Sequence, residues 1–143
     1  MTAKAFFRAS AIVLLVFAAL HTMGFLGFVP PTPQGLAVRD AMDSVQFTIK
    51  GATYSYGNFY RGFGMFITAA LLFEAFLAWM LGALATEKVR GVVSLGSAFV
   101  LLQLAGAAIA WRYFGIPQVT FCLLLVALLA TATLLARREA ATR

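Results

Sequence analysis

Three polar side chains fall inside long apolar stretches, where a polar group either carries chemistry or holds helices together. They are His21, Glu74 and Gln103. Counted at about 1.5 Å per residue from the outer end of each stretch, they lie at depths of roughly 12, 17 and 16 Å, close to one layer. Glu74 is the strongest candidate, because an ionisable side chain inside a membrane is costly and marks function by default. We therefore predict a polar layer in which Glu74 carries a proton or contacts a ligand.

The same residues also allow a purely structural interpretation. A carboxyl, an amide and an imidazole can hydrogen-bond across helices and hold them together. Small residues follow the same faces of these stretches, and such faces let membrane helices pack closely. Both interpretations stay open: Glu74 is a proton carrier with His21 as its partner, or the layer only specifies packing.

A second group of side chains lies where the chain would leave the membrane on its outer side. All four tyrosines and two arginines fall there. An aromatic belt with arginines reaching the lipid headgroups explains part of this set. The run over 54–62, Tyr-Ser-Tyr-Gly-Asn-Phe-Tyr-Arg-Gly, is denser in aromatic residues than a belt requires, and its glycines indicate a shaped backbone. The side chains expected at a ligand-binding mouth are Tyr56, Asn58, Tyr60, Arg61 and Arg112.

The composition identifies lipid as the main solvent of the chain. Of its 143 residues, 62% are hydrophobic and 11% are charged, against about 45–50% and about 25% in soluble proteins. The net charge of +6 comes mostly from lysines and arginines beside apolar stretches. They indicate topology and contact with anionic lipids, not a nucleic-acid partner. We expect an integral membrane protein and exclude a soluble enzyme.

Four apolar segments are long enough to cross a bilayer as helices. They run over about 9–29, 63–84, 92–114 and 119–136. Continuous apolar runs without two-residue alternation predict helices and not a barrel. The first segment lacks a cleavage motif and is interpreted as a retained helix, not a signal peptide. The expected fold is an all-α, four-helix membrane bundle that forms one domain over 1–143.

The lysines and arginines are shared unevenly between the two sides of the membrane. Most lie in the N-terminal tail, the connection around 85–91 and the C-terminal tail. Cytoplasmic segments carry the excess of these residues. The pattern therefore predicts a multi-pass protein with both termini in the cytoplasm and an extracytoplasmic loop over 30–61.

This loop is too long to lack structure of its own in a compact domain. Thr32 and Pro33 resemble an N-cap followed by a first-turn proline, so a short interfacial helix is expected over about 33–43. From 45 to 56 two patterns compete. Helical spacing continues through Val45 and Ile49, whereas alternation on both sides of Gly51 favours a hairpin. We favour the helix followed by an irregular hairpin, which together form a structured periplasmic loop.

Common catalytic and metal-binding motifs are missing from the sequence. It has one cysteine, Cys122, and one histidine, so an internal disulfide and bis-histidine haem ligation are excluded. It has no phosphate-binding glycine loop, no nucleophile elbow and no metal-spaced cluster of histidine and cysteine. We expect no cofactor and no metal, and we favour a binding protein over an enzyme.

Three short stretches carry a family resemblance: Leu20–Gly24, Asn58–Gly64, and Trp111–Phe114 with Pro117. Together with the long first loop, they resemble a widespread group of small uncharacterised bacterial four-helix inner-membrane proteins, loosely DoxX-like in architecture. Many members show Trp and Asp before the Phe-Tyr pair, where this chain has Gly57 and Asn58. The resemblance implies the architecture and the bacterial inner membrane, and brings no established activity.

The leading functional hypothesis is binding of a lipophilic or amphipathic small molecule in a pocket open to the periplasmic side. The outer side chains would form its mouth and the polar layer its floor. The alternatives are a proton-coupled transporter or membrane enzyme that uses Glu74, and a structural or accessory subunit. Membrane lipids are the expected partners, and the sequence is compatible with a homo-oligomer.

Overall fold

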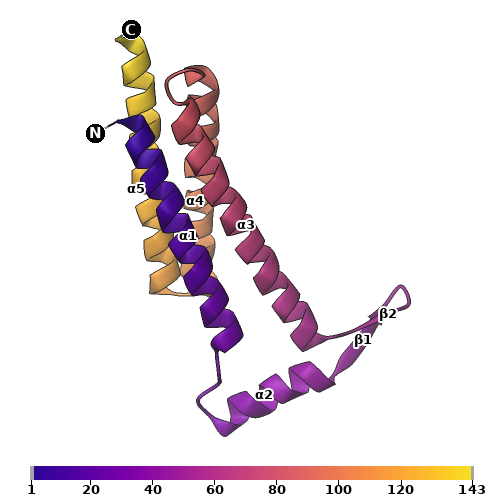
Figure 1. The fold of residues 1–143 in the computed structure, drawn as a ribbon. Helices are drawn as coiled ribbons and strands as arrows, with labels where there is room; N and C mark the ends of the chain where they lie inside the picture. Colours follow the sequence, from indigo (N-terminus) through magenta and orange to yellow (C-terminus); the bar gives the residue numbers. More distant parts are fainter. Residues whose placement is uncertain (1, 143) are drawn as a thin grey trace. The chain divides into compact units, whose positions relative to one another are not determined.

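The computed structural model describes residues 2–142, and most of them are helical. In chain order, its elements are α1 (Ala3–Gly27), α2 (Pro33–Ser44), β1 (Gln46–Ile49), β2 (Ala52–Ser55), α3 (Tyr56–Leu84), α4 (Val89–Tyr113) and α5 (Ile116–Ala141) (Figure 1). Within these residues, β1 and β2 form a two-stranded sheet. The prediction of an all-α fold is confirmed.

Four of these helices, α1, α3, α4 and α5, are long and apolar enough to cross a membrane. They contain 25, 29, 25 and 26 residues, whereas about 20 suffice for the hydrocarbon core. Four apolar helices of membrane-spanning length are therefore confirmed, and by length and composition they indicate a multi-pass membrane protein. Each helix begins earlier than its apolar segment, most clearly α3, which begins at Tyr56 and not at Phe63. Hydropathy locates the apolar stretch, whereas backbone hydrogen bonds continue the helix into polar sequence.

The chain forms two compact units, which we describe separately. The first unit contains the residues up to Phe17 and those from Leu72 onward, and the second contains Ala18–Leu71. Helices α1 and α3 therefore each contribute to both units.

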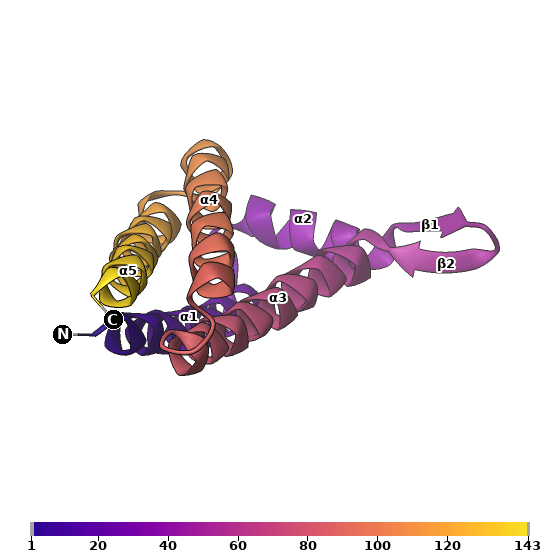
Figure 2. The same cartoon turned by 90° about the horizontal axis from the view of Figure 1, so that it is seen from above.

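In the first unit, α4 and α5 lie side by side and antiparallel (Figures 1 and 2). Gly115, with a φ of 145°, makes the tight connection, and Pro117 lies in the first turn of α5. The buried residues of α4 recur at helical spacing and form one face: Val92, Gly96, Phe99, Gln103, Ala107 and Ala110. Buried residues of α5 include Cys122, Leu125 and Leu129. The sulfur of Cys122 would lie 3.4 Å from a Cβ placed on Gly106.

The N-terminal part of α1 and the C-terminal part of α3 complete the core of this unit. Phe7 and Leu14 of α1 are fully buried, as is Leu81 of α3. The ring of Phe17 stacks on that of Phe121 with 4.6 Å between centroids. Close van der Waals contacts of this kind stabilise packed membrane helices.

In the second unit, α2 starts where the sequence predicted. The Thr32 hydroxyl accepts a hydrogen bond of 3.1 Å from the Gly35 N–H, and Pro33 occupies the first turn. The helix ends at Ser44, where the Val45 N–H donates to the Ala41 carbonyl. The predicted short helix is confirmed.

The segment after α2 is a hairpin, which resolves the two competing patterns. Its register pairs Gln46 with Ser55 and Ile49 with Ala52. Lys50 and Gly51 both have positive φ and form the two-residue turn typical of twisted hairpins. The hairpin is regular, not irregular as expected, and it projects beyond the end of α2 and the start of α3 (Figure 2).

Candidate functional site

A cavity of about 590 Å³ lies within the second unit, between the end of α1, helix α2 and the start of α3. Its size falls within the range of about 300–1,000 Å³ seen for small-molecule sites. Apolar side chains form much of its wall: Phe25, Leu26, Phe28, Val38 and Met42. Its polar side chains are Arg39, Asp40, Asp43, Tyr60 and Arg61. Such a wall suits a ligand with both an apolar and a charged part.

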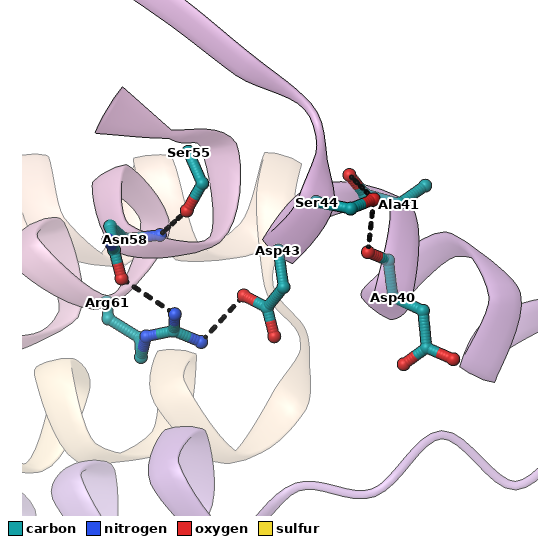
Figure 3. Close-up of polar contacts among 7 residues, drawn as sticks. All are labelled: Asp40, Ala41, Asp43, Ser44, Ser55, Asn58 and Arg61. Atoms are coloured by element: carbon teal, nitrogen blue, oxygen red, sulfur yellow. Dashed lines mark hydrogen bonds and ion pairs between the residues drawn. The ribbon is translucent and has the colours of Figure 1, made fainter. Parts of the chain in front are cut away.

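One polar network connects α2 to α3 beside this cavity (Figure 3). Arg61 Nη1 lies 2.9 Å from Asp43 Oδ1, and Arg61 Nη2 donates to Asn58 Oδ1 at 2.8 Å. The Asn58 N–H donates in turn to the Ser55 hydroxyl at 3.1 Å, which satisfies a free donor at the start of α3. Although exposed ion pairs contribute little stability, this one fixes the orientation of the Arg61 side chain.

The close approach of α2 to α3 depends on Gly57. A Cβ placed there would overlap Asp43 Oδ1 and would lie 3.3 Å from the Met42 carbonyl oxygen. We expected the run over 54–62 to be part of a loop with a shaped backbone. It is instead the end of β2 and the first turns of α3. Its glycine at 57 makes room for a neighbouring element.

We expect Gly57→Ala to lower the free energy of unfolding by about 1–3 kcal/mol, the usual cost of forcing extra volume into a packed contact. Asp43 would have to move, and the Asp43–Arg61 pair would break. Gly62→Ala is the matched control, because a Cβ at Gly62 meets nothing within 4 Å and alanine favours a helix by about 0.5–1 kcal/mol. Chemical unfolding in detergent measures both variants. Equal stability of the two would contradict the close contact at Gly57.

The predicted mouth residues divide among three places. Tyr60 and Arg61 line the cavity, and Asn58 holds Arg61. Tyr56 instead packs against the ring of Phe47 in β1, with 4.8 Å between centroids. Arg112 belongs to the first unit, at the last turn of α4, where its guanidinium lies 5.3 Å from the Tyr113 ring centroid.

Three charged residues of the cavity wall were not predicted as site residues from the sequence: Arg39, Asp40 and Asp43. They lie on α2, which the sequence predicted as a short interfacial helix without a role for these side chains. The available signal was a short helix with three charged residues in the same predicted loop as Tyr60 and Arg61.

Of the expected polar layer, the structure joins Glu74 and Gln103. Gln103 Nε2 donates to Glu74 Oε2 at 2.7 Å, which links α3 to α4 in the first unit. Only 5% of the Gln103 surface is exposed. The contact fits a structural role, because it pairs a buried donor with an acceptor across two apolar helices.

His21 has a different partner, in the second unit. Its Nε2 donates to the Gly64 carbonyl oxygen at 3.2 Å. Beside it, the hydroxyls of Thr22 and Thr68 lie 2.8 Å apart, and Thr68 also donates to the Gly64 carbonyl oxygen. These contacts join α1 to α3.

An aromatic cluster extends from the hairpin onto α3. It consists of Phe47, Tyr54, Tyr56, Phe59 and Phe63, with neighbouring ring centroids 4.8–6.0 Å apart. Tyrosine and phenylalanine on an exposed surface beside a membrane span are typical of the lipid interface. None of the residues of this cluster lines the cavity, so the cluster and the cavity occupy separate surfaces of the second unit.

Among residues 2–142, no group of three or more histidine, cysteine, aspartate or glutamate side chains is placed to hold a metal ion. Comparisons with protein-family models, curated proteins and solved structures found no match to the chain.

Proposed function

We propose that the protein binds a lipophilic or amphipathic small molecule in the cavity of the second unit. The observation that carries this proposal is the wall itself, which combines apolar side chains with two arginines and two aspartates. Because the residues of the wall all come from Ala18–Leu71, the site needs no contribution from Glu74 or Gln103. This differs from the expected arrangement, in which the polar layer formed the floor.

The proposal includes a location for the site. The distribution of lysine and arginine supports a four-helix bundle in a bacterial inner membrane, with cytoplasmic termini and α2 on the periplasmic side. The cavity would then open at the outer leaflet, where a membrane lipid or another amphiphile can enter from the bilayer. The resemblance to small bacterial four-helix membrane proteins supports the same location.

The test is ligand-dependent stabilisation of the purified protein in detergent by lipids extracted from bacterial membranes. A ligand present at 100 times its Kd stabilises the folded state by about 2.7 kcal/mol, which raises the midpoint of thermal unfolding. Val38→Trp should remove this shift, because Val38 lines the cavity and indole would fill it.

Leu36→Trp is the matched control for this experiment. Leu36 lies on the same helix, is also exposed, and does not line the cavity. We expect this variant to keep the lipid-dependent shift. The proposal is contradicted if the lipids do not shift the unfolding midpoint of the parent protein, or if both variants lose the shift equally.

A further inference from the structure

The four charged side chains of the cavity wall differ in whether they already have a partner. Arg61 and Asp43 neutralise each other at 2.9 Å, and Asn58 Oδ1 accepts a further hydrogen bond from Arg61 (Figure 3). This pair therefore offers a ligand no net charge.

Arg39 and Asp40 are the other two, and they follow each other on α2. Within residues 2–142, neither side chain forms a hydrogen bond or ion pair. The backbone carbonyl of Asp40 accepts a hydrogen bond from Ser44 at 2.9 Å, but its carboxylate has no contact (Figure 3). Arg39 lies one helical turn before Asp43, the usual spacing for a pair, yet Asp43 is bound to Arg61.

The cavity thus presents one free cation and one free anion beside an apolar wall. A guanidinium binds a phosphate through two parallel hydrogen bonds. A carboxylate accepts hydrogen bonds from a primary ammonium group. An anionic headgroup alone would be repelled by Asp40, and a cationic headgroup alone would be repelled by Arg39.

We propose that the ligand is a zwitterionic lipid whose headgroup carries a phosphate and a primary amine, with the phosphate at Arg39 and the ammonium at Asp40. Its acyl chains lie against Phe25, Phe28 and Val38. This inference rests on the proposed function and specifies its ligand class.

The first experiment measures binding of three short-chain lipids to the full-length protein in detergent by titration calorimetry. The probes are dihexanoyl phosphatidylethanolamine, dihexanoyl phosphatidylglycerol, which lacks the amine, and dihexanoyl phosphatidylcholine, whose ammonium has no N–H donors. We expect the ethanolamine lipid to bind about tenfold more tightly than the other two, which corresponds to about 1.4 kcal/mol. Free phosphoethanolamine should bind at least about tenfold more weakly than the lipid, because it cannot use the apolar wall.

Two variants then test which part of the headgroup each charged side chain binds. Asp40→Asn keeps the shape of the side chain and should abolish the preference for ethanolamine over glycerol. Arg39→Gln should weaken binding of all three phospholipids, because each carries a phosphate. Glu87→Gln and Lys88→Gln are matched controls, because they remove neighbouring opposite charges from the connection between α3 and α4. Neither control should change any affinity.

The outcomes separate this inference from the proposed function. If none of the three lipids binds, the headgroup inference is overturned, and the proposed function fails as well only if the extracted lipids give no stabilisation. If the three lipids bind equally, or if Asp40→Asn leaves the preference intact, only the headgroup inference is overturned. If free phosphoethanolamine binds as tightly as the lipid, the ligand is the free headgroup compound and not a lipid.

Discussion

Replacement of Gln103 by leucine is expected to lower the free energy of unfolding by about 1–3 kcal/mol. The substitution removes the donor that lies 2.7 Å from Glu74 Oε2. It leaves a carboxyl group without that partner inside an apolar span, and an unsatisfied buried polar group costs about this amount. Unfolding in mixed detergent micelles measures the change.

Glu74→Leu and the double variant complete a thermodynamic cycle. The single variant Glu74→Leu leaves the buried amide of Gln103 unpaired and should also destabilise. The double variant removes both polar groups, and such paired replacements are often nearly neutral. We therefore expect the double variant to be more stable than the sum of the single effects predicts. Additive effects would contradict a structural role for this hydrogen bond.

The same pair decides between packing and proton transport. Glu74→Gln keeps an oxygen that accepts from Gln103 but cannot carry a proton. A structural role predicts that this variant stays folded with an unchanged proton flux in reconstituted vesicles. A flux in the parent protein that disappears in Glu74→Gln would instead establish Glu74 as a proton carrier.

A second large effect is expected at the interface of α4 and α5. A Cβ on Gly96 would overlap the hydroxyl oxygen of Thr133 and would lie 3.4 Å from its Cβ and its methyl group. That hydroxyl is buried and donates to the Leu129 carbonyl oxygen at 2.7 Å. Gly96→Ala should therefore break this hydrogen bond or separate the helices, at a cost of about 1–3 kcal/mol.

Two further variants separate the steric contact from the effect of alanine itself. Gly91→Ala lies on the same helix, where a Cβ meets nothing within 4 Å, and should not destabilise the protein. Thr133→Ala removes the obstructing hydroxyl, so Gly96→Ala/Thr133→Ala should recover most of the lost stability. A double variant as unstable as Gly96→Ala would show that the steric contact is not the cause.

The elements governed by local patterns could be predicted from the sequence. The four spans follow from apolar length, and α2 follows from the Thr32–Pro33 start signal. The hairpin follows from alternation and from Gly51. Each of these signals acts between residues close in sequence, where propensity and hydropathy are informative.

The contacts between distant residues could not be predicted in the same way. Depth in the membrane indicated that Glu74 and Gln103 could meet, and they do. Depth says nothing about the direction of a side chain, and His21 bonds to the backbone at Gly64. Likewise, Arg61 takes Asp43 as its partner only because Gly57 lets α2 approach α3. Such choices depend on packing, which a single sequence does not encode locally.

Cys122 gives the chain a built-in reporter of helix separation. It is the single cysteine, it is buried on α5, and its sulfur faces Gly106 on α4. A maleimide can reach this thiol only when the two helices move apart or the protein unfolds. The rate of alkylation of the otherwise unaltered protein therefore measures how often the α4–α5 interface opens, without the introduction of any label site.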